Sequence, residues 1–144
     1  MKTNNKTSVL LVEDDANLRN NISNSLNSVD YRVYTTKKST EGLELFKKFD
    51  IDLCIIDVEL TGIDGFALSA QIRMLSPDMP VIYLIPKGLH INMLKNIEYG
   101  IDDYVTKPFN NDELLLRIKA VLRHIERNDP FSYSLGGSKI QIGR

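Results

Sequence analysis

Short apolar runs alternate along this chain with longer segments in which apolar residues return every three or four positions. Runs of this length are typical of buried β-strands, and the longer spacing is typical of amphipathic helices. We predict strands at five runs: Val9 to Val12, Arg32 to Thr35, Ile51 to Asp57, Pro80 to Ile85 and Asp103 to Thr106. Because strands and helices alternate, the pattern predicts an α/β domain, a doubly wound parallel sheet with helices on both faces.

Five helices are predicted from the spacing of apolar residues. These residues are Leu18, Ile22, Leu26 and Val29 in the first helix, Leu43, Phe46 and Phe49 in the second, Phe66, Ala70 and Leu75 in the third, Ile91, Leu94 and Ile97 in the fourth, and Leu114, Leu115, Ile118, Val121, Leu122 and Ile125 in the fifth. We expect Asp64 to cap the third helix, and Asn110 or Asn111 to cap the fifth. The fourth should end at Gly100.

The predicted elements divide the 144 residues into three parts. We expect residues 1–7 to be a flexible N-terminus, because they precede the first apolar run. Residues 8–127 contain all the predicted elements, and 42% hydrophobic residues are ample for one core. After residue 127 the helical pattern stops at Asn128-Asp129-Pro130. We therefore interpret residues 128–144 as a linker and the beginning of another domain.

Charge and hydropathy narrow the possible partners. With 18 Lys and Arg against 19 Asp and Glu, the net charge of -1 gives no bulk attraction to nucleic acid or to an anionic membrane. No apolar stretch approaches the ~18 residues of a membrane span, and the first residues lack a signal-peptide pattern, so we expect a cytoplasmic protein. The single cysteine, Cys54, lies in an apolar run, and we interpret it as an inert core thiol rather than a redox or catalytic group.

Acidic residues follow two of the predicted strands. Glu13, Asp14 and Asp15 follow the first, and Asp57 ends the third, although alone Asp57 could merely begin a turn. In a doubly wound sheet the carboxyl ends of the strands meet at one edge, with neighbouring strands about 4.8 Å apart. Carboxylates this close repel one another, so either one takes up a proton or a cation lies among them. We expect Mg²⁺, which prefers oxygen ligands and is often held by one or two carboxylates.

Lys107 follows the fifth predicted strand and should reach the same edge. Alone it could be a surface lysine beside a turn proline. With Glu13, Asp14 and Asp57, however, it forms a set in which an acid can act as a nucleophile, since carboxylates form aspartyl phosphates. Phosphoryl transfer depends on positioning and on neutralising charge, and a metal ion and a lysine supply both.

Three segments resemble the receiver domain of two-component response regulators: Val9 to Asp15, the loop from Asp57 to Gly65, and Asp102 to Phe109. The resemblance covers about residues 8 to 127 and implies a flavodoxin-like fold with strand order 2-1-3-4-5. It implies a phosphoprotein rather than an enzyme, one that phosphorylates and dephosphorylates only itself.

The resemblance also assigns roles at the site. Asp57 would accept a phosphoryl group from a partner histidine kinase, and Lys107 would contact the phosphate. Mg²⁺ would be held by Glu13, Asp14, Asp57 and the backbone carbonyl of Glu59. The Lys107–Pro108 peptide would be cis, and the rotamer of Tyr104 would report the phosphorylation state.

The segment from Glu113 to Arg123 resembles the fifth helix of OmpR/PhoB-type regulators, which place a winged-helix DNA-binding domain after the receiver. Residues 131–144 resemble the first strands of such a domain, so promoter DNA would be bound only through the missing C-terminal domain. In that subfamily the fourth helix, fifth strand and fifth helix form a homodimer face. Charged residues at such positions are Glu98, Asp102, Asp103, Glu113, Arg117 and Lys119. They could equally be a solvated charged surface.

The chain departs from the family pattern after the fourth strand. Ile85 stands where the family has Thr or Ser, and Pro86 where it has a small residue. In the family this hydroxyl hydrogen-bonds a phosphoryl oxygen and draws the following loop inward. A hydrogen bond to a charged group contributes roughly 1.5 to 3 kcal/mol, about as much as a whole allosteric coupling. Phosphorylation is therefore expected to shift the conformation only weakly.

Two other classes of function stay open on the sequence. One is a pseudo-receiver that acts by constitutive protein contact with weak or no phosphorylation switching, which Ile85 and Pro86 favour. The other is a small metal-dependent phosphatase, which would turn over added phosphomonoesters.

Overall fold

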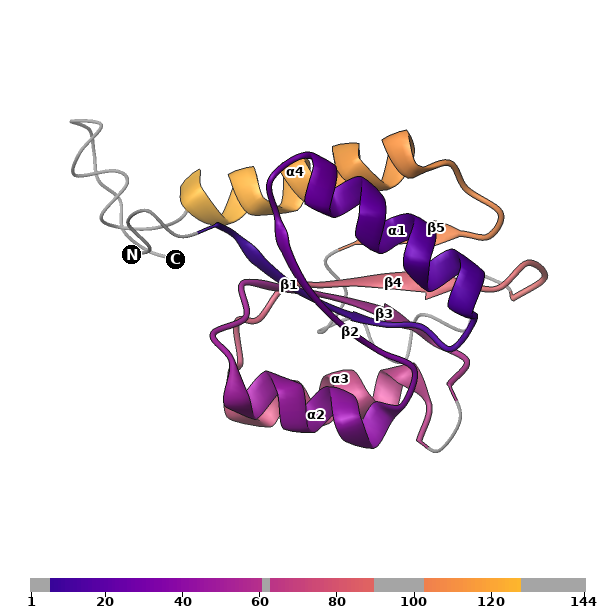
Figure 1. Cartoon of the computed structure of the whole chain (residues 1–144). Helices are drawn as coiled ribbons and strands as arrows, with labels where there is room; N and C mark the ends of the chain where they lie inside the picture. The colour runs from indigo at the N-terminus through magenta and orange to yellow at the C-terminus, as the bar shows by residue number, and fades with distance from the viewer. Residues whose placement is uncertain (1–5, 61–62, 90–102, 128–144) are drawn as a thin grey trace.

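The computed structural model describes residues 6–60, 63–89 and 103–127. Within them, five parallel strands form one sheet in the order β2-β1-β3-β4-β5 (Figure 1). The strands are β1 (Ser8–Val12), β2 (Arg32–Thr36), β3 (Leu53–Asp57), β4 (Val81–Ile85) and β5 (Asp103–Thr106). The predicted fold class and strand order are confirmed. The largest shift of a strand boundary is at β3, which begins two residues later than predicted.

Among the described residues, helices cover both faces of the sheet (Figure 1). Helices α1 (Ala16–Ser28) and α4 (Asn111–Arg127) lie on one face, and α2 (Ser39–Lys48) and α3 (Gly65–Leu75) lie on the other. The label α4 belongs to the helix that the sequence predicts as the fifth. The helix predicted around Ile91 to Ile97 lies outside the described residues.

Each face of the sheet carries its own apolar cluster. The α1 and α4 side contains Val9, Leu11, Ile55 and Leu84, and the α2 and α3 side contains Leu10, Ile56 and Tyr83, among others. Strands β1, β3 and β4 are buried along their whole length because helices cover both of their faces. This double burial explains why these strands appear in the sequence as continuous apolar runs rather than as alternating patterns.

Side chains at the helix starts fix where the loops end. Asp15 caps α1 by accepting the Leu18 N–H, and Asp64 caps α3, as predicted, by accepting the Ala67 N–H. For α4 the sequence left two candidates, and Asn110 is the residue that accepts the Glu113 N–H, at 2.8 Å. Each cap satisfies a backbone donor that the first helical turn leaves without a partner.

Asn111, the other candidate cap, has a different role. Its amide donates to Ser25 Oγ at 2.7 Å, on α1. The contact ties the start of α4 to α1, the neighbouring helix on the same face of the sheet.

Three predicted helix faces need correction. At the end of α4, Ile125 is exposed rather than part of the buried face. In α3 the buried residues include Leu68 and Ile72, whereas Ala70 is exposed and Leu75 is 54% exposed. The spacing of Ala70 and Leu75 was misleading because apolar residues occur on more than one side of α3. Val29 caps the end of α1 and is 41% exposed rather than part of its buried stripe.

No helix in the described ranges is long and apolar enough to cross a membrane. Residues 1–5 and 128–144 lie outside the described part of the chain, so the predicted flexible N-terminus, linker and second domain stay predictions.

Candidate functional site

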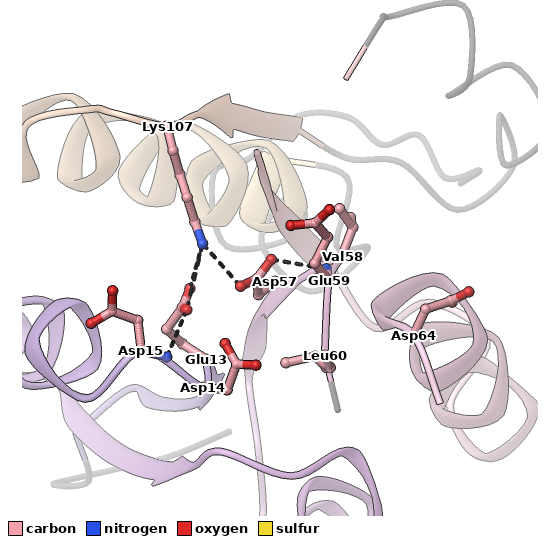
Figure 2. Close-up of a pocket in the computed structure, with 9 residues that line it drawn as sticks. All are labelled: Glu13, Asp14, Asp15, Asp57, Val58, Glu59, Leu60, Asp64 and Lys107. Atoms are coloured by element: carbon pink, nitrogen blue, oxygen red, sulfur yellow. Dashed lines mark hydrogen bonds and ion pairs between the residues drawn. The ribbon is translucent and has the colours of Figure 1, made fainter. Parts of the chain in front are cut away.

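A pocket lies at the edge of the sheet where β1, β3 and β5 end (Figure 2). Figure 2 shows the Lys107 side chain reaching from its own loop toward the acidic residues of the other two strands. The residues that line the pocket are Glu13, Asp14, Asp15, Asp57, Val58, Glu59, Leu60, Asp64 and Lys107. The structure therefore brings together the residues that are predicted to bind metal and phosphate: Glu13, Asp14, Asp57, Glu59 and Lys107.

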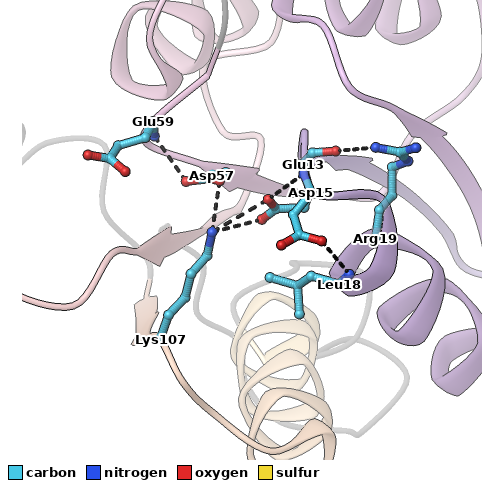
Figure 3. Close-up of polar contacts among 7 residues, drawn as sticks. All are labelled: Glu13, Asp15, Leu18, Arg19, Asp57, Glu59 and Lys107. Atoms are coloured by element: carbon cyan, nitrogen blue, oxygen red, sulfur yellow. Dashed lines mark hydrogen bonds and ion pairs between the residues drawn. The ribbon is translucent and has the colours of Figure 1, made fainter.

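Glu13 continues directly from β1, and its side chain is fully buried. Its backbone is held from two sides, because its N–H donates to Thr36 O at 3.0 Å and its carbonyl accepts from Arg19 Nη1 at 2.8 Å (Figure 3). Glu13 Oε2 accepts the Asp15 N–H at 3.1 Å. The next residue, Asp14, is exposed. The turn from β1 into α1 thus presents one buried and one exposed acid to the pocket.

Asp57 ends β3 and is 2% exposed. Its Oδ1 accepts the Glu59 N–H at 2.9 Å, and its Oδ2 accepts a hydrogen bond from the Lys107 ammonium. The start of α3 packs directly against the end of β3, since a Cβ at Gly65 would lie 2.2 Å from Asp57 O. Only glycine allows so close an approach of two backbone segments.

Lys107 lies in the loop after β5, next to the cis Lys107–Pro108 peptide that the resemblance implies. Its N–H donates to Ile85 O at 2.8 Å, and its ammonium lies 2.9 Å from Asp57 Oδ2 and 3.2 Å from Glu13 Oε1. Partial burial alone would lower the pKa of Lys107. The hydrogen bond to Asp57 and the charges of Glu13 and Asp57 outweigh burial and raise the pKa, so the ammonium stays charged at neutral pH.

The acidic residues fit a divalent cation. One carboxylate oxygen from each of Glu13, Asp14 and Asp57 lies within 4.8 Å of the others. Glu13 Oε1 is buried and makes no hydrogen bond among the described residues, where its polar contact is the ion pair with the Lys107 ammonium at 3.2 Å. Burial raises the pKa of Glu13 to about 7, and the negative charge of Asp57 adds to the rise, although the Asp15 N–H and Lys107 oppose it. A single lysine therefore compensates these acids incompletely, and the all-oxygen donor set suits Mg²⁺.

The two predicted switch residues lie beside the pocket without lining it. Ile85 ends β4, is 2% exposed and packs in the apolar cluster with Tyr83. Tyr104 on β5 is partly buried against the same cluster. Ile85 thus contributes an apolar side chain and no hydroxyl at the strand end between Asp57 and Lys107.

The predicted dimer face is only partly described. Arg117 on α4 pairs with Asp103 at 2.7 Å and with Glu113 at 3.3 Å, both within the same chain. Lys119 is exposed, and Glu98 and Asp102 lie outside the described residues. The dimer face stays a prediction.

Three contributors to the site were not predicted. Asp15 was grouped with the acidic cluster but serves as a helix cap, and Arg19 holds the Glu13 carbonyl (Figure 3). Ser39, at the start of α2, accepts the Ile63 N–H from the loop after β3. An Asp three residues before Leu18 is a recognisable capping signal, whereas the contacts of Arg19 and Ser39 depend on how the chain folds back on itself.

Residues 9–119 match the model of the response regulator receiver domain. The chain belongs to this family. The receiver domain is 37% identical over 120 residues to the transcriptional regulatory protein RprY of Bacteroides fragilis, a match that covers 83% of this chain and 51% of RprY. It is 40% identical over 129 residues to the transcriptional regulatory protein AfsQ1 of Streptomyces coelicolor, covering 90% of this chain and 57% of AfsQ1.

A putative response regulator from Chloroflexus aurantiacus has the same fold in its crystal structure. It superposes with a TM-score of 0.76 at 31% identity, over 82% of this chain and 98% of that one. The receiver domain predicted from the sequence is confirmed, and relatives named as transcriptional regulators agree with the predicted subfamily. This chain spans about half the length of RprY and AfsQ1.

Proposed function

We propose that this chain is the phosphoacceptor domain of a transcriptional response regulator, in which Asp57 receives a phosphoryl group from a histidine kinase. One observation carries the proposal. The buried Asp57 carboxylate has one oxygen fixed by the Glu59 N–H and the other 2.9 Å from the Lys107 ammonium, beside two further acids. A structural ion pair needs no third and fourth charge, whereas phosphoryl transfer needs both a cation site and a mobile positive group.

Asp57 Oδ2 is the better placed nucleophile, because its partner is a flexible lysine rather than a backbone N–H. The carboxylate oxygen forms a bond to phosphorus while the P–N bond of the phosphohistidine donor breaks. The electron pair of that bond remains on the imidazole nitrogen. Lys107 then exchanges its contact with Oδ2 for a contact with a phosphoryl oxygen, so its charge follows the negative charge that moves onto Asp57.

Glu13, Asp14, Asp57 and the carbonyl of Glu59 would hold Mg²⁺ in this proposal. When bound, the ion would neutralise charge on the phosphoryl oxygens and help to place the phosphorus within reach of Asp57. Glu13 would contribute a buried carboxylate oxygen, Oε1, which makes no hydrogen bond among the described residues and contacts the Lys107 ammonium at 3.2 Å. Asp14 lines the pocket and is exposed to solvent, so a Mg²⁺ ion bound beside it would keep several of its water molecules.

We propose that the protein turns over only its own acyl phosphate. The described residues that line the pocket include no histidine, serine or cysteine as a second nucleophile. A metal-dependent phosphatase would hydrolyse added phosphomonoesters, and we expect no release of para-nitrophenol from para-nitrophenyl phosphate above the rate of the Asp57→Ala variant.

We propose regulation of transcription as the output. Phosphorylation would control a homodimer formed by the predicted fourth helix, β5 and α4, and through it DNA binding by a C-terminal domain. The support is that the relatives covering most of this chain are named transcriptional regulatory proteins and are about twice as long as the match.

Intact mass after incubation with acetyl phosphate and Mg²⁺ tests the proposal. We expect an increase of one phosphoryl group in the wild type and none in Asp57→Ala. EDTA should prevent the increase. A wild-type protein that gains no phosphoryl group with Mg²⁺ present would instead support a pseudo-receiver.

A further inference from the structure

The backbone between β3 and α3 forms one wall of the pocket, through Val58, Glu59 and Leu60. The two ends of this loop are joined next to Asp57, where the Gly65 N–H donates to Val58 O at 3.0 Å. Farther along, the Ile63 N–H donates to Ser39 Oγ at 3.2 Å, on a helix 24 residues earlier in the chain. The loop that follows Asp57 is therefore attached to α2 as well as to its own strand.

Ser39 is suited to act as an anchor. It is the first residue of α2 and is 1% exposed, so its hydroxyl is held by the packing around it rather than moving freely in solvent. The helix behind it is packed closely on the sheet, because a Cβ at Gly42 would lie 3.0 Å from a Val12 methyl group. Movement of the hydroxyl would require movement of α2 against β1.

The turn that leads into Ser39 also holds the opposite wall of the pocket. Thr36 O, at the end of β2, accepts the Glu13 N–H at 3.0 Å. The Thr36 hydroxyl donates to Glu41 on α2 and accepts the Lys38 N–H at 3.2 Å. The segment from Thr36 to Ser39 thus contacts both the β1 edge, which carries Glu13, and the loop after Asp57.

We propose that Ser39 is a positioning residue for the phosphorylation site. Its hydroxyl holds the backbone after Asp57 at a fixed separation from Glu13 and Asp14, and so sets the affinity of the site for Mg²⁺. This inference rests on the proposed function in one respect, that the metal bound there supports transfer to Asp57. It adds a residue from α2, an element that supplies none of the residues that line the pocket.

The Ser39→Ala variant isolates the hydroxyl, because alanine favours the helix at least as well as serine. The Ile63 N–H then loses its acceptor, and the loop gains freedom that metal binding must remove. We expect the Mg²⁺ concentration for half-saturation to rise by about 2- to 10-fold, the range for loss of one ordinary hydrogen bond. The phosphorylation rate at saturating Mg²⁺ should stay within about twofold, since the chemistry itself is unchanged.

Ser69→Ala is the matched control. Ser69 is also a nearly buried serine in a helix, 3% exposed, and its hydroxyl lies 2.7 Å from the Tyr83 hydroxyl, away from the pocket lining. Its removal should lower stability and leave Mg²⁺ affinity unchanged. Ser39→Thr keeps the hydroxyl and should restore wild-type Mg²⁺ affinity. Ser39→Cys keeps the volume but offers a weak acceptor, and decides the question if Ser39→Ala does not fold.

Three measurements on the folded chain test the inference: hydrogen exchange at the Ile63 amide, a Mg²⁺ titration followed by the Glu59 amide resonance, and phosphorylation by acetyl phosphate against Mg²⁺ concentration. Faster exchange with weaker Mg²⁺ binding in Ser39→Ala, but not in Ser69→Ala, is expected. Equal Mg²⁺ affinity in Ser39→Ala and the wild type, or an equal loss in both serine variants, would overturn the role of Ser39. A wild type that binds Mg²⁺ more tightly than Ser39→Ala but takes up no phosphoryl group would refute the proposed function alone.

Discussion

Two neighbouring parts of the same sheet edge differ sharply in chemistry. The ends of β1 and β3 and the loop after β5 bring Glu13, Asp57 and Lys107 together around a pocket. The end of β4 lies between Asp57 and Lys107 in the sheet, yet it carries the buried, apolar Ile85 followed by Pro86. The groups on which the proposed phosphoryl transfer depends are therefore present, whereas the end of β4, which is expected to sense the phosphoryl group, has no hydroxyl at Ile85.

This difference separates two properties of the domain. One is the phosphorylation of Asp57, and the other is the conformational change that phosphorylation causes elsewhere in the domain. Removal of Lys107 should slow phosphoryl transfer to Asp57, since the buried carboxylates of Glu13 and Asp57 would lose the ammonium that pairs with both. We expect Lys107→Ala to slow phosphorylation by acetyl phosphate about 100-fold, the size typical for loss of one charge that stabilises a transition state. Quenched-flow mass spectrometry measures the rate. Lys87→Ala, an exposed lysine in the loop after β4, is the control and should react at the wild-type rate.

The acidic side of the comparison is tested by two neighbouring aspartates. Asp14→Asn should raise the Mg²⁺ concentration for half-maximal phosphorylation about 10-fold, because a charged ligand becomes neutral. Asp15→Asn should change it by less than about twofold, since Asp15 serves as a cap and Asn caps helices equally well. An equal effect of both variants would mean that the metal responds to the total charge of the turn rather than to a defined ligand.

The apolar side is tested by supplying the missing hydroxyl. If Ile85 weakens the coupling between phosphorylation of Asp57 and dimerisation, Ile85→Thr should strengthen dimerisation of the beryllium fluoride adduct about 5-fold or more. A change of this size is within the usual range of allosteric coupling. The variant without adduct should dimerise like the wild type. Sedimentation velocity gives the dimer fraction in all four samples. A wild type that already dimerises strongly on adding beryllium fluoride would refute weak coupling.

The interior of β3 should be chemically silent, in contrast to its end. Burial raises the pKa of the Cys54 thiol to about 12, because an apolar surrounding disfavours the thiolate. The thiol thus stays protonated through neutral and mildly alkaline pH, and thiolate appears only as the pH approaches that pKa. We expect no alkylation by iodoacetamide between pH 7 and pH 9 in the folded protein and rapid alkylation in urea. Labelling of the folded protein that rises across this range would contradict the burial of Cys54.

The convergence of the main site residues could be predicted from the sequence, because a single rule of sheet topology places all of them. In a parallel sheet the strand ends meet at one edge, so Glu13, Asp57 and Lys107 had to converge once their strands were recognised. Contacts between layers escaped prediction, because no spacing in the sequence connects Ser39 with Ile63 or Arg19 with the Glu13 carbonyl. The prediction of the buried face of α3 was wrong for a related reason. The spacing of apolar residues does not show which side of a helix is buried when some of them, such as Ala70 and Leu75, are exposed to solvent.

The central claim is that Asp57 carries the phosphoryl group. Borohydride reduces an aspartyl phosphate to homoserine, so tandem mass spectrometry of protein treated with acetyl phosphate, Mg²⁺ and then borohydride locates the modified residue. We predict homoserine at position 57 in the wild type and at no other aspartate. Homoserine at Asp14 or Asp15 with Asp57 intact, or no homoserine in protein that has bound Mg²⁺, would contradict the account.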